Sequence, residues 1–489
     1  MSARPELLQP ALGQAGQVLP LGLILCTVAL VAWALSLNLG RLVHNKASLL
    51  RATDAAVYSA AVAQARALNL HAYLNRAQLA QQVAMAHLIT MASAQRYRAT
   101  LAQQASRLNP PVALIGMLFG PQYGAAYLSA KTGGTGDQVA LAQLSDAFNR
   151  HDDVIHHVIE RVRAEQFKSL SSYRNQILED VLVKNVGASG SSMTGATMNE
   201  LGLEATFMVD DLPGFVSRFS STDRRWQAML KRVSKQYGFL NERNHTTRNL
   251  WAVNLRCPHK RHELRRKGST RLGPSGDWSV QDHQSFHALR YNRVIGCYQR
   301  EYPMGWALIN SSVRGRTTQM AGSVADTLPQ NFSNQSFWRW VGTQADGGWN
   351  IFSGGDNHLA RRWASGQPIR WTTQGMPSFG TLTPKHKDSI RLAIAVTQQS
   401  PLIHTGATLE EKRFGAQFSL GSSERVQALY AESAATTYFA PPEAVGRSVT
   451  APNLFQPFWQ ARLIDIAKTK QKVLKDKSTR SQFAQSATQ

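Results

Sequence analysis

The residues best suited to chemistry are two cysteines and two histidines in the second half of the chain. Cys257 is followed by His259 and His262, and Cys297 lies farther along. Thiolates and imidazoles are the common ligands of zinc, but the spacing C-x-H-x-x-H differs from the usual finger and ribbon intervals. The two cysteines can instead remain free thiols, or form a disulfide in an oxidising compartment. Of these three alternatives we favour the disulfide Cys257–Cys297.

A second group of histidines and carboxylates lies between residues 151 and 157, in a segment with the apolar spacing of a helix. A helix would place Asp152 and His156 on one face, as two metal ligands require. The exposed polar face of an amphipathic helix produces the same pattern. We expect an exposed polar face here, and we predict no metal site and no cofactor.

Hydrolase signatures are incomplete in this chain. Residues 187–191 read GASGS, which differs from G-x-S-x-G, and His262-Glu263 lacks the second histidine of H-E-x-x-H. The K-T-G at residues 131–133 is typical of penicillin-recognising enzymes, but the S-x-x-K motif that accompanies it does not occur. We therefore expect no enzymatic activity.

The formal net charge of +23 at pH 7 favours binding to an anionic partner. Nucleic acid, a phospholipid surface and an acidic polysaccharide all qualify, although such a charge can also serve solubility alone. A dense basic run lies at residues 256–271, and tryptophans interleave with arginines farther on; such residues can stack on bases or sugars and neutralise phosphates. Alternating Trp and Arg is equally typical of a half-exposed strand. The candidate polymer-binding residues are Arg261, Arg265, Arg266, Lys267, Trp338, Trp340, Arg361, Arg362 and Trp363.

The element that must position these residues begins near the N-terminus. Residues 18–39 carry no charged side chain, and as a helix they would reach about 33 Å, enough to cross a bilayer core. Ala32-Trp33-Ala34 has the form of a signal-peptide cleavage site, but the apolar run continues to Leu39 and little positive charge precedes it. We expect a retained transmembrane helix, with Cys26 as a small apolar residue within it.

The remaining patterns predict an α+β protein in which the transmembrane helix continues into an Ala-rich helical stalk, followed by a helical segment and a β-rich C-terminal domain. The predicted parts, in chain order, are a short N-terminal segment (1–17), the transmembrane helix (18–39), the helical stalk (40–108), a mainly helical region (109–185), a Gly/Ser/Thr linker (186–200), the β-rich domain (201–464) and a basic tail (465–489).

Three segments carry a resemblance to a known family. Residues 49–56 read LLRATDAA just after the apolar span, residues 69–77 read NLHAYLNRA, and residues 453–463 read NLFQPFWQARL. In this order they resemble the TadE/TadG-like proteins of the tight-adherence (Flp pilus) assembly system. The resemblance covers both ends of the chain and leaves most of residues 110–440 unassigned.

The resemblance implies a protein anchored in the inner membrane by a single N-terminal helix, with its bulk periplasmic or extracellular. Its partners would be the membrane and other pilus-assembly subunits. Arg41, Lys46 and Arg51 follow the span and favour the opposite orientation by the positive-inside rule, whereas a disulfide favours an exported bulk. The expected function is a non-enzymatic component of pilus or secretion-system assembly; the alternative is a membrane-tethered module that binds DNA or a cell-surface glycan.

Asp54 is the candidate residue for helix interaction. It is the lone acid in an apolar and basic stretch, and Arg51 and Tyr58 lie at helical contact spacing from it. We predict that Asp54 pairs locally or with a helix of a partner subunit.

Overall fold

The computed structural model shows a mixture of helices and mainly antiparallel sheets. It describes residues 18–133, 137–187, 197–219, 224–293, 296–314, 368–383, 389–399, 428–442 and 451–467. The chain divides into two compact units, which we call unit 1 and unit 2. Unit 1 comprises Met1–Asn69, Phe167–Phe215 and Leu382–Gln489, and unit 2 comprises Leu70–Gln166 and Val216–Thr381.

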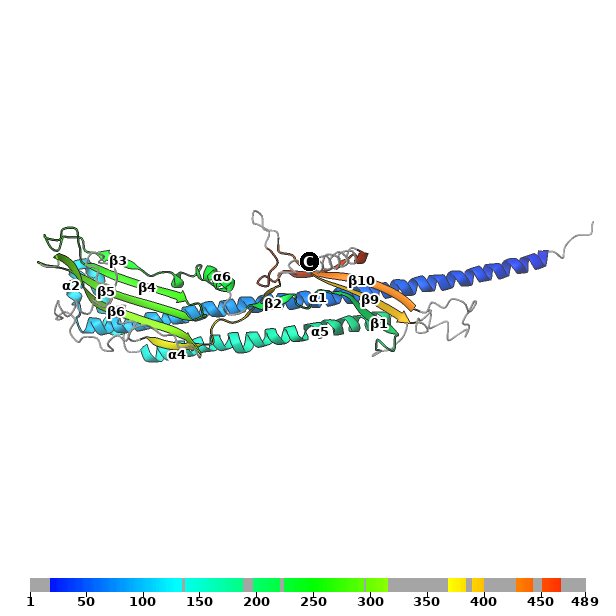
Figure 1. The fold of residues 1–489 in the computed structure, drawn as a ribbon, viewed down its shortest axis with the longest axis horizontal. Helices are drawn as coiled ribbons and strands as arrows, with labels where there is room; N and C mark the ends of the chain where they lie inside the picture. The colour runs from blue at the N-terminus through cyan, green and yellow to red at the C-terminus, as the bar shows by residue number, and fades with distance from the viewer. Residues whose placement is uncertain are drawn as a thin grey trace, which may run out of the picture. The chain divides into compact units, whose positions relative to one another are not determined.

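Helix α1 runs without interruption from Val18 to Ser106 and is drawn in blue in Figure 1. Its length follows from its composition, because residues 41–106 contain neither glycine nor proline and are rich in Ala, Leu, Gln and Arg. Among the residues that the structure describes, it is the one helix long and apolar enough to cross a membrane. Along the apolar segment most side chains are exposed, for example Leu19 at 74% and Leu39 at 63%.

The helices that follow are shorter, and a π-helical turn lies within the longest continuous stretch of them, residues 137–187. Two small helices, α2 (Val112–Phe119) and α3 (Pro121–Ser129), approach closely where a Cβ on Gly124 would lie 2.9 Å from the Cα of Gly116. The remaining helical elements are η1 (Ala130–Gly133), α4 (Asp137–Asp153), the π-helix η2 (Val154–Ile159), α5 (Glu160–Gly187), α6 (Arg224–Ser234) and η3 (Gly238–Leu240).

Unit 1 contains a four-stranded antiparallel sheet in the order β1-β9-β10-β11. Its strands are β1 (Leu203–Asp210), β9 (Ser389–Gln399), β10 (Ala428–Phe439) and β11 (Trp459–Ile464). The sheet buries its inner face against the helical parts of the same unit, since small residues of α1 allow close packing. The shared core includes Leu49, Ala56, Val57, Leu178, Leu182, Leu392, Ile394 and Val396.

Unit 2 contains a five-stranded sheet in the order β3-β4-β5-β6-β7, in which only the β6–β7 pair is parallel. Its strands are β3 (His245–Arg248), β4 (Glu263–Leu272), β5 (Trp278–Asn292), β6 (Gly296–Val313) and β7 (Ile369–Thr373). A Cβ on Gly305 of β6 would lie 3.0 Å from the ring of Tyr97, so glycine permits close contact with α1. The two remaining strands, β2 (Val216–Phe219) and β8 (Phe379–Leu382), pair with each other.

The strands do not form the single domain over residues 201–464 that the sequence suggests. Strand β1 pairs with β9 through Leu203↔Gln398 and its neighbours, so β1 and β9–β11 belong to unit 1, while β3–β7 belong to unit 2. The reason is long-range hydrogen bonding, which a local alternation pattern does not report. Most of the predicted linker and of the basic tail lies outside the described residues.

Candidate functional site

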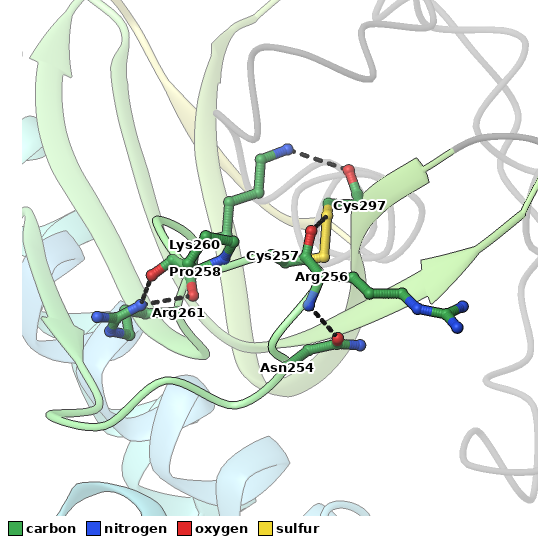
Figure 2. Close-up of a disulfide and its surroundings, with 7 residues drawn as sticks. All are labelled: Asn254, Arg256, Cys257, Pro258, Lys260, Arg261 and Cys297. Carbon is green, nitrogen blue, oxygen red and sulfur yellow. Dashed lines mark hydrogen bonds between the residues drawn. A yellow bond between two sulfur atoms is a disulfide. The ribbon is translucent and has the colours of Figure 1, made fainter.

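A disulfide joins Cys257 and Cys297, whose Cα atoms are 6.0 Å apart (Figure 2). Cys257 lies in the loop of residues 249–262 that connects β3 to β4, which we call the stapled loop; Cys297 is at the start of β6. The bond consumes both thiols, so the cysteine–histidine zinc site that the sequence left open does not form. In the described part of the chain, no group of three or more His, Cys, Asp or Glu residues is arranged to hold a metal ion.

The base of the stapled loop is closed by Asn249, which is 3% exposed. Its main-chain N–H donates to the carbonyl of His262 at 3.1 Å, and its Oδ1 accepts from the N–H of His262 at 2.8 Å. Its Nδ2 also donates to the carbonyl of Trp251 at 2.9 Å. An amide side chain carries both a donor and an acceptor, so one asparagine can make both of these side-chain hydrogen bonds.

The rest of the loop is held by short-range hydrogen bonds and by the disulfide. Asn254 accepts from the N–H of Arg256 through its side chain at 2.9 Å, and from the N–H of Cys257 through its carbonyl at 2.9 Å. Figure 2 shows Lys260 reaching across the disulfide, where its Nζ donates to the carbonyl of Cys297 at 3.0 Å. The Arg261 guanidinium turns back to the carbonyl of Pro258 at 2.6 Å. The loop is therefore ordered by its own polar contacts.

His262 is neutral in this arrangement. Its Nδ1 accepts the N–H of Leu289 at 2.7 Å, a role that a doubly protonated ring cannot fill. Burial and the nearby positive charge of Arg290 lower its pKa from 6.5 to about 4. His262 is thus a structural residue at the junction of the stapled loop and β4.

The described polymer-binding candidates are not equally accessible. Arg265 is 8% exposed and donates to Glu263 at 2.6 Å and to Gln299 at 2.9 Å. The Arg266 guanidinium lies 4.8 Å from the ring centroid of Tyr97, while Arg261 and Lys267 are half-buried. The basic run therefore does not form one continuous exposed strip. The other candidates, Trp338, Trp340, Arg361, Arg362 and Trp363, lie outside the described residues.

The histidine–carboxylate group at residues 151–157 is only partly an exposed polar face, contrary to our expectation. Asp152 is 4% exposed, and its carboxylate accepts the Thr373 hydroxyl at 2.9 Å and the Gln374 N–H at 2.8 Å. His156 lies between two carboxylates, with Nε2 3.7 Å from Asp152 and Nδ1 3.7 Å from Glu160. The sequence suggested exposure because the segment that covers this face, after β7, is distant along the chain.

Glu160 and Arg163 extend this buried cluster. Glu160 accepts from the N–H and the hydroxyl of Ser378 at 2.8 and 2.7 Å. Burial acts to raise its pKa, but hydrogen bonds from His156 and Ser378 outweigh that effect and lower the pKa to about 2. Arg163 is 1% exposed and donates to Gln78 at 2.9 Å. These contacts fix the segment after β7 to the helices of unit 2.

Asp54 has a hydrogen-bond partner within unit 1. The hydroxyl of Ser433 on β10 donates to its Oδ1 at 2.5 Å. The partner is thus a strand of the same chain, and neither Arg51 nor Tyr58. Asp54 is half-buried, so the residue keeps some exposure to solvent beside this contact.

A reciprocal pair that the sequence did not single out joins two distant segments of unit 1. The Asn69 side chain donates to the carbonyl of Trp459 at 2.9 Å and accepts the Trp459 N–H at 2.9 Å. The indole N–H of Trp459 donates to the carbonyl of Asn453 at 3.1 Å, and this side chain is 2% exposed. The only signal in the sequence was that Asn69 and Trp459 both fall in segments with the family resemblance.

Comparison of the chain with models of known protein families, with curated proteins and with solved structures gives no match.

Proposed function

We propose that this protein is a non-enzymatic, membrane-anchored component of a Flp-type pilus or a related secretion apparatus. Helix α1 supplies the anchor and continues directly into the folded part of the chain. The inner membrane is the proposed location, with the bulk of the protein on its outer side.

One observation carries the proposal. The segments that resemble the TadE/TadG-like proteins come from opposite ends of the chain, and in unit 1 they contact one another through Asn69 and Trp459. The ATDAA segment joins the same sheet through Asp54 and Ser433. Because these segments belong to one structural unit, their contact supports treating the resemblances at the two ends as parts of one fold rather than as chance similarities.

The orientation is supported by the disulfide. Cysteine pairs persist as disulfides outside the cytoplasm and are reduced within it. The pair Cys257–Cys297 is buried on the Cys257 side, at 3% exposure, and is tied into β6. This favours export of unit 2 over the cytoplasmic placement that Arg41, Lys46 and Arg51 suggest.

The test is a deletion of the gene, with piliation as the readout. We expect loss of surface pili, and recovery on complementation with the wild-type gene. A Trp459→Ala variant should fail to complement because it removes the buried indole beside this joint, which contacts Phe215 and Phe439 and donates to the carbonyl of Asn453. A variant at an exposed position of the same strand, Arg462→Gln, should complement, and normal piliation of the deletion strain would contradict the proposal.

The alternative function, binding of DNA or a cell-surface glycan by the exported part, has weaker support. Arg265 is buried and Arg266 stacks on Tyr97, so only part of the basic run can reach a polymer. Two results together would favour this alternative. The purified protein would bind DNA or an acidic glycan in a salt-sensitive way, and the deletion strain would keep its pili.

A further inference from the structure

The stapled loop presents apolar side chains to solvent on an ordered backbone. Leu250 is 92% exposed, Leu255 is 95% exposed and Trp251 is 48% exposed. Single exposed leucines are ordinary, but these three large apolar side chains lie close together in the sequence of one short loop. Folding does not explain this concentration, which we call the apolar patch. The loop holds them in place through Asn249, Asn254 and the disulfide, so presenting them to a partner costs little conformational entropy.

The loop that carries this patch is also basic. Residues 249–262 contain Arg256, His259, Lys260 and Arg261 but no Asp or Glu. Arg256 is exposed and its guanidinium lies 4.9 Å from the ring centroid of Tyr291 at the end of β5. The next acid in the chain, Glu263, is buried and paired with Arg248 and Arg265. The charge of the loop is therefore not cancelled by carboxylates within it.

From this combination we propose that the stapled loop is a membrane-interface site. It inserts Leu250, Trp251 and Leu255 at the polar–apolar boundary of a bilayer, while Arg256 and its basic neighbours contact anionic headgroups. The site acts in addition to the α1 anchor, and it does not depend on the proposed role in pilus assembly.

A lipid surface fits this patch better than a protein or a polymer does. One Trp and two Leu side chains offer far less than the roughly 800 Å² per partner of a typical stable protein interface. A bilayer needs no complementary shape, Trp favours the interfacial zone, and each basic residue near an anionic surface contributes about 1 kcal/mol. DNA or an acidic glycan would use the cations and Trp251, but would gain nothing from Leu250 and Leu255.

In the test, α1 is first inserted into a nanodisc, so that insertion of α1 into the vesicles cannot be mistaken for binding by the loop. Full-length protein is reconstituted into neutral phosphatidylcholine nanodiscs and mixed with separate vesicles, either of phosphatidylcholine alone or with phosphatidylglycerol added. We expect co-flotation with the anionic vesicles, weakened by salt, and an apparent affinity at least about tenfold lower for Leu250→Ser/Leu255→Ser. The matched control, Met117→Ser/Leu128→Ser, removes apolar side chains that are 64% and 50% exposed elsewhere in unit 2 and should bind as the wild type does.

Because all of the substituted side chains are exposed, both double variants should unfold at the wild-type temperature, which separates loss of binding from loss of folding. Equal co-flotation of the wild type and the loop variant would overturn the proposal. So would an absence of vesicle binding together with heparin or DNA binding that Arg256→Gln weakens, since that result would identify a polymer site instead.

Discussion

Arg265 and Arg261 belong to the same basic run, yet they have different environments. Arg265 is buried against Glu263 and Gln299, whereas Arg261 is half-buried and bonds to carbonyls of its own loop. A buried guanidinium needs a carboxylate partner because an unpaired buried charge is costly. The role of each arginine therefore depends on its neighbours. Arg265 forms a buried ion pair on a strand, whereas Arg261 stabilises the turn of its own loop.

Replacement of Asn69 by alanine tests the joint between the ends of unit 1. Asn69→Ala leaves the main-chain N–H and carbonyl of Trp459 without their partner, so we expect the free energy of unfolding to fall by about 1–3 kcal/mol. Denaturant unfolding of the detergent-solubilised protein measures this change. Asn185→Ala, which removes an exposed side-chain bond within α5, is the control and should change stability by no more than about 0.5 kcal/mol.

The lowered pKa of His262 leads us to expect that the stability of the protein depends on pH. Its folded-state pKa is about 4 against an ordinary value of 6.5, so folding favours the neutral ring. The stability it contributes is fully present above pH 6.5 and is lost as the pH falls from 6.5 toward 4, by on the order of 1–3 kcal/mol. His262→Gln should flatten the profile of melting temperature against pH in this window, and the exposed His245→Gln should not. An unchanged slope in His262→Gln would show that another group titrates there.

At the scale of elements, helices and strands are joined by buried ion pairs as well as by apolar contacts. Arg174 of α5 is 2% exposed and contacts Asp210 of β1 through two hydrogen bonds of 2.7 and 2.8 Å. Its guanidinium also lies 5.1 Å from the ring centroid of Phe207. The paired geometry satisfies both carboxylate oxygens, so α5 is held in a defined position along β1.

Arg174→Ala should therefore be strongly destabilising. Removing Arg174 leaves the carboxylate of Asp210, which is 23% exposed, without its charged partner, and we expect a loss of about 2–4 kcal/mol in the free energy of unfolding. Arg174→Lys should recover only part of it, because an ammonium cannot make both bonds. The control is Arg271→Ala, whose pairing with Glu242 is at 3.8 Å between side chains that are 73% and 66% exposed. That change should cost less than about 1 kcal/mol, and comparable losses in the two variants would refute the argument.

At the scale of the whole molecule, both units are assembled from discontinuous segments of the chain. Unit 1 uses the beginning, a middle segment and the end of the sequence, and α1 and α5 each contribute residues to both units. Pairing of β1 with β9 requires closure of a long stretch of chain, which is slow relative to local helix formation. We therefore expect the helices to form before the sheets during folding.

The disulfide predicts the thiol reactivity of the whole chain, which depends on the compartment of the protein. In unreduced, denatured protein from its native compartment, only Cys26 should react with a thiol reagent, and all three cysteines should react after reduction. Cys257→Ser/Cys297→Ser should lower the free energy of unfolding by up to about 4 kcal/mol, since the bond closes a loop with a sequence separation of 40. Cys26→Ser is the control. Labelling of all three cysteines without reductant would remove the support for an exported unit 2.

Features that depend on local composition could be predicted from the sequence. Residues 18–39 have a length and polarity that only a bilayer or a buried site accommodates, and the absence of glycine and proline over residues 41–106 allows one continuous helix. Cys257 and Cys297 are the only cysteines outside the apolar span, so the number and place of the cysteines were sufficient to suggest this disulfide. The presence of both helical and strand-like segments likewise predicted a mixed fold.

Which distant segments of the chain contact one another could not be predicted from the sequence. The pairing of Asn69 with Trp459, the burial of Asp152 beneath the segment after β7, and the division of the strands between two sheets each join residues far apart in the chain. A local pattern reports which face of a helix or strand is polar, but not what covers that face. The same limit explains why the exposed leucines of the stapled loop were not predicted as a site: a local apolar pattern does not report which side chains the folded chain leaves exposed.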